Sequence, residues 1–189
     1  MPRLYLARHG ETEWNAIGRL QGHTDVPLNE RGRQQARELA AAVRTLGIGS
    51  VITSDLARAR ETGAIIAGEL GLGEPRVVAE LRERRIGVFE GLTRDECMVR
   101  YPEAWAAWHA RTGVPDGAEA LAEATARMHA VLGTLAEEPG DPALVVSHGG
   151  VMRLWLVDVL GRAVPPLHNG ITFAIERDGA AWSAVMLRG

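Results

Sequence analysis

The chain has 189 residues, of which 46% are hydrophobic and 24% charged, and its formal net charge at pH 7 is −3. This length and composition predict one globular domain with a complete hydrophobic core, and the near balance of charge predicts no general attraction to nucleic acid or to a membrane surface. Because all 21 basic residues are arginines, lysine chemistry such as Schiff-base formation is excluded.

The single cysteine and the distribution of apolar residues point to a compartment. Cys97 allows neither an internal disulfide nor a cysteine-based zinc cluster. No apolar run approaches the ~20 residues of a membrane span, and we expect no signal peptide. These features predict a reducing, cytoplasmic location.

The first predicted element is a short buried strand from Leu4 to Ala7, which runs directly into Arg8, His9 and Gly10. A strand directs Arg8 and His9 to opposite faces of a sheet, but Gly10 lets the backbone leave extended geometry, so that both side chains can face one pocket. Ligands of α/β sheets bind beyond the carboxyl ends of strands. The pair therefore indicates an anion site, although a lone pair of this kind more often marks only a polar strand end.

The rest of the chain alternates predicted helices with predicted strands. The predicted elements are a loop at 18–27, a helix capped by Asn29 and ended by Gly47, a strand at 51–53, a helix capped by Ser54 or Asp55 and ending near Leu70, a strand at 76–79, a helix from Thr93 through Tyr101, a helix at 118–137, a strand from Ala143, a helix to Leu160, and two strands at 171–175 and 182–186 around a turn at Gly179.

This pattern predicts an α/β fold, a three-layer α/β/α sandwich whose central sheet is mostly parallel with an antiparallel edge strand. We expect residues 1–189 to form one domain, with a small cap-like insertion around 93–120. The charge-dense stretch at 80–91 is predicted to be a solvated loop.

A second corner repeats the first. The strand from Ala143 runs into His148 and Gly149, so that the chain holds two strand–His–Gly corners. Guanidinium groups bind tetrahedral oxyanions, and Arg58 lies at a third strand-to-helix corner. Two imidazoles, two guanidiniums and the carboxylate of Glu83 are groups that phosphoryl transfer requires.

At this point the sequence resembles the histidine phosphatase superfamily, the phosphoglycerate-mutase-like proteins. The resemblance extends from about residue 4 to residue 175, and its blocks follow one another in order. The matching blocks are Leu6 to Thr12 with Trp14 and Asn15, Leu20 to Gly22 with Asp25, Pro27, Leu28 and Gly32, Ser54 to Thr62, Leu81 to Glu83 with Gly87 and Glu90 to Thr93, Ser147 to Val151, and Asn169 with Gly170.

The resemblance implies a catalytic role for five residues. His9 would attack phosphorus and become phosphohistidine, while Arg8, Arg58 and His148 would hold the phosphoryl oxygens. Glu83 would protonate the leaving oxygen and then accept a proton from the attacking water.

The resemblance also implies a pocket and its ligand. Asn15, Gln21, Gly22 and Gly149 would bind the substrate, a small phosphorylated metabolite. No metal and no cofactor would be needed, since side chains supply the positive charge. We expect no nucleic-acid or membrane partner, and a homodimer remains open.

Three arginines put the role of Glu83 at risk. Arg82, Arg84 and Arg85 surround it in the sequence, and nearby cations lower the pKa of a carboxyl group, whereas a general acid requires the opposite. They must therefore point elsewhere. Glu80 is the alternative candidate for the acid.

The remaining histidines and the tryptophans of the cap are harder to interpret. His23 and Phe89 stand where many relatives carry a tryptophan, and either difference could reshape the mouth of the pocket. Trp105, Trp108 and His109 would select the substrate if they line the cap, or else belong to its core. The four histidines outside the two corners are interpreted as surface or helix-face residues: His23, His109, His129 and His168.

The choice of reaction follows from the cover over the site. Mutases of this family resemble one another in a longer insertion and in an asparagine after the final His-Gly, where this chain has Gly150. Less cover admits water, so a phosphatase is favoured, with an α-ribazole-phosphate phosphatase or a phosphoglycerate mutase as alternatives. A metal hydrolase and an inactive phosphate-binding module are the alternatives from other classes.

Overall fold

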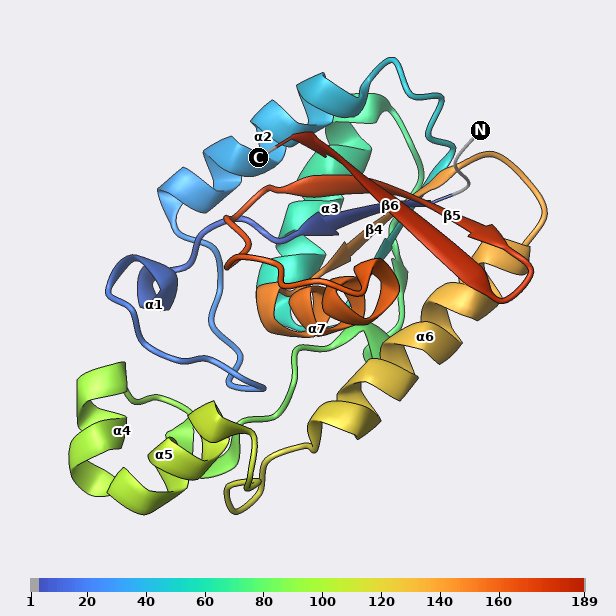
Figure 1. Cartoon of the computed structure of the whole chain (residues 1–189). Coiled ribbons are helices and arrows are strands. Elements are labelled where there is room, and N and C mark those ends of the chain that lie inside the picture. The colour runs from blue at the N-terminus through green and yellow to red at the C-terminus, as the bar shows by residue number, and fades with distance from the viewer. Residues whose placement is uncertain (1–3, 189) are drawn as a thin grey trace.

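A six-stranded mixed sheet forms the centre of the computed structural model, which describes residues 4–188 (Figure 1). The strands are β1 (Leu4–Arg8), β2 (Ser50–Thr53), β3 (Arg76–Val77), β4 (Ala143–Ser147), β5 (Thr172–Asp178) and β6 (Ala181–Arg188). Their order across the sheet is β3-β2-β4-β1-β5-β6. The first four run parallel, whereas β5 is antiparallel to β1 and β6 to β5, which confirms the predicted sheet.

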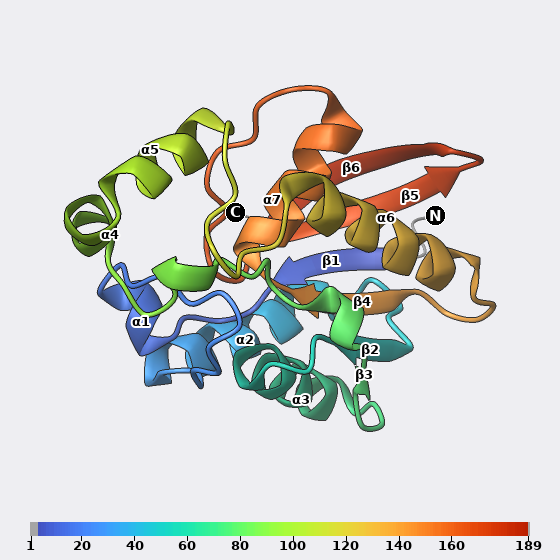
Figure 2. The same cartoon turned by 90° about the horizontal axis from the view of Figure 1, so that it is seen from below.

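Helices cover both faces of this sheet (Figure 2). They are α2 (Glu30–Val43) and α3 (Ala57–Leu70) on one face, and α6 (Leu121–Glu137) and α7 (Gly149–Leu160) on the other. In α2, for example, Ala36, Leu39 and Val43 are buried because their helical spacing puts them on one side. The predicted three-layer sandwich is confirmed.

Helices α2 and α3 differ in how their N-termini are capped. The Asn29 side chain accepts a hydrogen bond from the Gly32 amide at 2.8 Å, so this predicted cap is confirmed. The cap predicted at Ser54 or Asp55 is wrong, because the N-cap residue is Leu56. Asp25, which lies far earlier in the chain, accepts a hydrogen bond from the Ala57 amide at 2.7 Å instead.

The segment at 80–91 is not the solvated loop that its charge predicts. It contains two short 3₁₀ helices, at Ala79–Leu81 and Gly87–Phe89, and Leu81 and Phe89 are fully buried. Arg84 is also buried, with only 8% of its surface exposed. The apolar residues pack this segment into the fold despite its charge.

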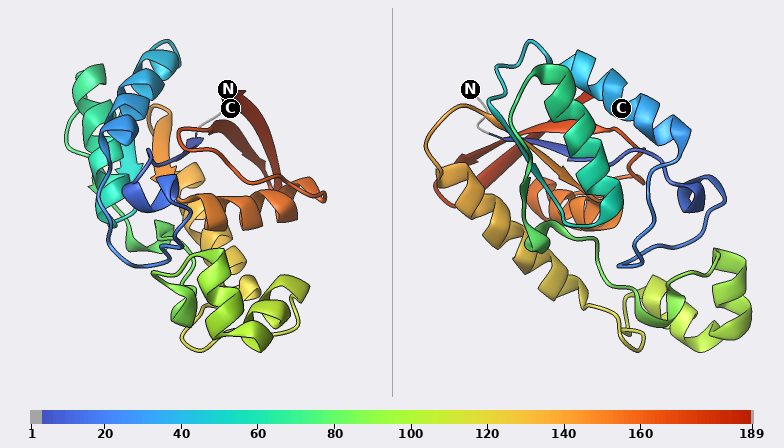
Figure 3. Two further views of the ribbon diagram at one scale, coloured as in Figure 1. Left: turned by 90° about the vertical axis from the view of Figure 1, so that its left-hand side faces the viewer. Right: turned by 180° about the vertical axis from the view of Figure 1, so that it is seen from behind.

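Short helices occupy one end of the molecule, away from the sheet (Figures 1 and 3). These are α4 (Arg94–Arg100), capped by Thr93 as predicted, and α5 (Pro102–Ala110); a single turn, α1 (Glu13–Ala16), follows the first strand. The ring of Phe89 lies edge-on to Trp105 and Trp108, at centroid distances of 5.3 and 5.7 Å. These tryptophans therefore pack against the apolar cluster of Phe89, Leu92 and Cys97.

The predicted boundaries are closely matched elsewhere. Helix α6 begins at Leu121, three residues after the predicted start. The strand predicted at 76–79 shortens to Arg76–Val77. Within residues 4–188, no helix combines the length and apolar character that crossing a bilayer requires. One domain with a cap around 93–120 stays a prediction.

Candidate active site

Two histidines meet where β1 and β4 end. The strands are parallel neighbours with Arg8 opposite Ser147, so the residues that follow them, His9 and His148, leave the sheet side by side. Their ring centroids are 5.1 Å apart, and 2% and 0% of their surfaces are exposed. Both imidazoles are thus within reach of one phosphate.

The hydrogen bond of His9 determines which ring nitrogen is free. Its Nδ1 lies 2.6 Å from the carbonyl oxygen of Gly10, and a carbonyl can only accept, so Nδ1 carries the proton. The Nε2 nitrogen then keeps its lone pair. Burial, followed by the charges of Arg58 and Arg8, lowers the pKa of His9 well below its usual value of 6.5. The ring is therefore neutral at pH 7 and has the form of a nucleophile.

His148 has the opposite arrangement. Its Nδ1 accepts a hydrogen bond from Nε of Arg58 at 3.2 Å, so in the neutral ring Nε2 carries the proton. This Nε2 is buried without a hydrogen-bond partner among residues 4–188. Burial and then Arg58 lower the pKa of His148 well below 6.5. The ring presents an N–H donor next to the lone pair of His9.

Arg58 is held by the loop that contains Gly22 and Thr24. Its NH1 donates to the carbonyl of Thr24 at 2.9 Å and its NH2 to that of Gly22 at 2.8 Å. Only 1% of its surface is exposed. Burial lowers its pKa to about 10, so the guanidinium stays charged at neutral pH. Each terminal nitrogen keeps one further hydrogen for an anion.

Arg8 is the second cation of the site. Its NH1 donates to the carbonyl of Leu167, and its Nε is buried without a partner among residues 4–188. Gly149 allows this position, because a Cβ there would lie 2.9 Å from Nε of Arg8. Burial lowers the pKa of Arg8, and the charges of Glu83 and Glu11 oppose that shift.

Glu83 reaches the first turn of α7 from the 80–91 segment. Its Oε2 accepts a hydrogen bond from the Gly150 amide at 2.8 Å, and its Oε1 accepts from the amides of Val151 and Arg84 at 2.7 and 2.8 Å. The start of α7 immediately follows His148, so the carboxylate lies beside the two histidines. A group that can exchange a proton is thus adjacent to the site.

Among the described residues, none of the three neighbouring arginines forms an ion pair with this carboxylate. Arg82 makes a two-pronged ion pair with Asp55 at 2.7 and 2.5 Å, which lowers the pKa of that aspartate. The guanidinium of Arg84 donates to the carbonyl of Glu119 and lies 3.7 Å from the ring centre of Trp108. Arg85 is exposed, and so is the alternative acid Glu80. Glu83 therefore remains the better candidate for the acid.

Of the predicted pocket residues, Asn15 lies in the first turn after β1. The Oδ1 of Asn15 accepts hydrogen bonds from Thr12 and from Nδ2 of Asn169, and that same Nδ2 donates to the carbonyl of His9 at 3.0 Å. Gln21 is 8% exposed, and its Oε1 has no hydrogen-bond partner among the described residues. The hydrogen bond between Asn15 and Asn169 thereby connects the first of the matching blocks to the last.

Other residues support the site although no role was predicted for them. The Thr62 hydroxyl accepts the Gly10 amide at 3.0 Å, the Ser147 hydroxyl donates to the carbonyl of Leu81 at 2.8 Å, and Glu90 accepts the His23 amide at 3.1 Å. Thr62, Ser147 and Glu90 stand within the matching blocks, which is the signal that could have found them.

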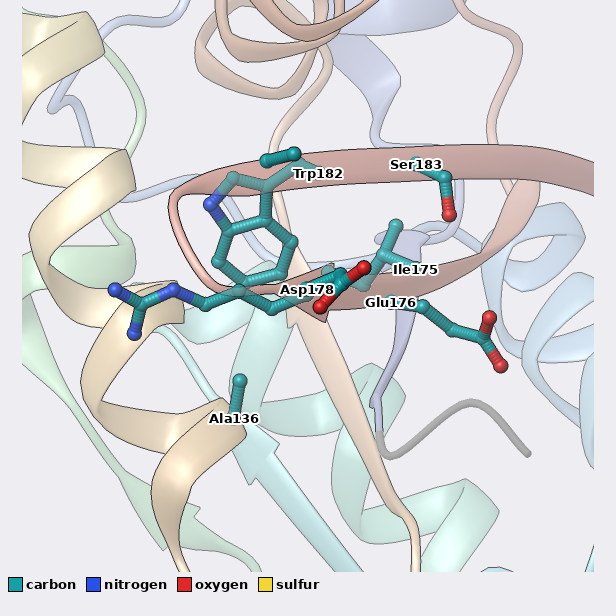
Figure 4. Close-up of a pocket in the computed structure, with 8 residues that line it drawn as sticks. Ala136, Ile175, Glu176, Asp178, Trp182 and Ser183 are labelled. Atoms are coloured by element: carbon teal, nitrogen blue, oxygen red, sulfur yellow. The ribbon is translucent and has the colours of Figure 1, made fainter.

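A surface hollow elsewhere is not part of this site. It has a volume of about 570 Å³ and lies between the β5–β6 turn and α6, where Figure 4 shows Trp182 and Asp178. Leu4, the first residue of β1, pairs with Ile175, so this turn lies at the opposite end of the sheet from Arg8. Within residues 4–188, no three His, Cys, Asp or Glu side chains gather as a metal site requires.

Two buried histidines, two guanidiniums and one carboxylate are the kinds of groups that phosphoryl transfer uses. The chain belongs to the histidine phosphatase superfamily (branch 1), whose sequence model matches residues 4–187. The resemblance of the motifs to this family is thus confirmed.

Similar proteins are named for both of the activities considered above. The chain is 41% identical over 168 residues to a probable phosphoglycerate mutase GpmB of Klebsiella pneumoniae, covering 85% of this chain and 76% of that protein. The structure is similar to a mycobacterial glucosyl-3-phosphoglycerate phosphatase (TM-score 0.82, 28% identity, 98% and 97% covered). It is also similar to a putative α-ribazole-5′-P phosphatase from Escherichia coli (TM-score 0.85, 27% identity, 98% and 95% covered).

Proposed function

We propose that this chain is a metal-independent phosphomonoesterase that hydrolyses small phosphorylated metabolites through a phosphohistidine on His9. The observation that carries the proposal is the pair of opposite ring forms: a lone pair on Nε2 of His9 beside an N–H on Nε2 of His148. One ring can attack phosphorus while the other donates to a phosphoryl oxygen, and neither needs to change its protonation state first.

The first half-reaction transfers the phosphoryl group to the enzyme. The Nε2 lone pair of His9 forms a bond to phosphorus as the P–O ester bond breaks, and Glu83 in its acid form gives its proton to the leaving oxygen. Arg8, Arg58 and His148 stabilise the charge on the equatorial oxygens. Losing one of these donors is expected to raise the barrier by about 2–4 kcal/mol.

The second half-reaction restores the enzyme. Glu83, now a carboxylate, takes a proton from water as its oxygen attacks phosphorus and the P–N bond to His9 breaks. Oε2 of Glu83 accepts one backbone hydrogen bond and Oε1 accepts two, so Oε2 has more capacity left for the proton. Phosphate and an alcohol leave, and the histidine is neutral again.

A screen over small phosphomonoesters tests the proposal. It includes 3-phosphoglycerate and α-ribazole phosphate, in buffer with and without EDTA, for the native chain and for His9→Ala. We expect phosphate release that EDTA does not change and that His9→Ala abolishes, together with an acid-labile phosphoenzyme trapped during turnover. Loss of activity in EDTA would indicate a metal hydrolase, and absence of turnover with every ester would indicate a binding module.

Phosphoglycerate mutase is the second candidate, because the relative that shares 41% identity is named as a probable one. A mutase must return the phosphoryl group to glycerate before water removes it. Gly150 is exposed and carries no side chain to cover the intermediate, which favours hydrolysis. Conversion of 3-phosphoglycerate to 2-phosphoglycerate faster than phosphate release would make the mutase the correct assignment.

A further inference from the structure

We propose that His23 is a positioning residue that holds the backbone of Glu83 in place for proton transfer to the leaving group. Nε2 of His23 lies 2.7 Å from the carbonyl oxygen of Glu83. A carbonyl can only accept, so Nε2 carries a proton and donates it. The interpretation of His23 as a surface or helix-face residue is wrong, since the ring is half-buried and bridges two segments 60 residues apart in sequence.

The segment that carries His23 also holds Arg58. The carbonyls of Gly22 and Thr24, on either side of His23, accept hydrogen bonds from Arg58. The amide of His23 and the hydroxyl of Thr24 in turn donate to the carboxylate of Glu90, at 3.1 and 3.2 Å. His23 therefore lies between the loop that holds Arg58 and the segment that carries Glu83.

Glu83 consequently has two separate anchors. The start of α7 holds its carboxylate through the amides of Gly150 and Val151, and His23 holds its backbone. The amides hold the carboxylate while the remaining capacity of Oε2 exchanges the proton with the leaving oxygen. The bond from His23 acts on the backbone of Glu83 itself and joins it to the segment that holds Arg58.

This arrangement predicts a loss that depends on the leaving group. An alkoxide needs a proton as it leaves, whereas p-nitrophenolate is stable without one. The value of kcat/KM reports the steps through the first P–O cleavage only. Misplacing Glu83 should therefore lower kcat/KM for an alkyl phosphate and leave that for p-nitrophenyl phosphate nearly intact.

The experiment compares the native chain with His23→Ala and His23→Gln on glycerol 2-phosphate and on p-nitrophenyl phosphate. We expect His23→Ala to lower kcat/KM for the alkyl ester about tenfold and for the aryl ester less than about twofold. His23→Gln, whose amide nitrogen can donate from a similar position, should recover the alkyl value to within about threefold. Thermal unfolding shows whether each variant is folded, and His23→Gln keeps the test decisive if His23→Ala is not.

His129→Ala is the matched control. His129 also bridges two elements, since it accepts from Nε1 of Trp155 and bonds Asp158 at 2.8 Å, but it lies between α6 and the later part of α7. We expect both of its kcat/KM values to match those of the native chain. A selective alkyl loss in this control would overturn the inference.

Three further outcomes decide the matter. An equal loss on both esters in His23→Ala would assign His23 a purely structural role, and no loss would assign it none. Failure of His23→Gln to recover activity would show that the hydrogen bond is not the cause. The inference rests on the phosphatase proposal; if the native chain hydrolyses neither ester, this inference fails, whereas the screen over phosphomonoesters decides the phosphatase proposal separately.

Discussion

Replacing Gly150 by alanine tests how closely the fold positions Glu83. A Cβ at position 150 would lie 2.7 Å from Oε1 of Glu83, whereas ordinary contact begins at 3.4 Å. The carboxylate must retreat by about 0.7 Å, and it can do so because it is the end of a flexible side chain. Its hydrogen bonds from Gly150 and Val151 are then weakened or lost.

Two effects of opposite sign determine the stability of Gly150→Ala. Alanine within a helix is favoured over glycine by about 1 kcal/mol. Each hydrogen bond to a charged group contributes about 1.5–3 kcal/mol, and exposure to water at position 150 reduces this amount. We therefore expect a net destabilisation of about 1–2 kcal/mol, measured by urea unfolding at pH 7. Turnover of an alkyl phosphate should fall more than about tenfold, because the acid has moved.

Gly68→Ala provides the matched control for this change. Gly68 is an exposed glycine of α3 with no heavy atom within 4 Å of the added Cβ. The same substitution there should stabilise the protein by up to about 1 kcal/mol and leave turnover unchanged. If Gly150→Ala is stabilising like Gly68→Ala and keeps its alkyl phosphatase activity, then Glu83 is not held as described.

Three other outcomes follow from the same contacts. Burial lowers the pKa of His9 and His148, so below pH 6.5 the unfolded chain binds protons that the native chain does not. The free energy of unfolding should therefore fall as the pH drops from 7 to 5, by up to about 1.4 kcal/mol per pH unit for each histidine. Urea unfolding at a series of pH values measures this fall, and a free energy that does not change with pH would contradict it. Asp25→Ala should cost about 1 kcal/mol in thermal unfolding, since it removes the partner of the first amide of α3; a larger loss in Asp25→Asn would argue against capping. Arg82→Ala should change stability by less than about 1 kcal/mol and alkyl turnover by less than about twofold, because this exposed guanidinium pairs with Asp55; a large rise or fall in kcat would show that it acts on Glu83.

Local patterns were sufficient to predict most of the secondary structure. The cap at Asn29, the cap at Thr93 and the turn at Gly179 each depend on residues within a few positions, so their signals are present in a short stretch of sequence. The corners at His9 and His148 were recognised as two sites of the same kind. Their contact could be inferred only from the resemblance, because strand order is set by packing across the whole sheet.

The errors arise where the partner of a residue lies far away in the chain. Arg84 was placed in a solvated stretch, but the ring of Trp108 and the carbonyl of Glu119 compensate its burial. His23 donates to the backbone of Glu83, and a backbone acceptor leaves no mark on residue type. Asp25 displaces the local caps at the start of α3 for the same reason.

The distant cap of α3 has a consequence for how the protein folds. Leu56 offers no side-chain cap, and the charge of Arg58 in the first turn opposes the helix dipole. This turn is therefore weak by itself and is completed only when Asp25 and the carbonyls of Gly22 and Thr24 dock on it. The start of the helix and the loop around it should thus become ordered together, and protection of the Ala57 amide from hydrogen exchange would report that step.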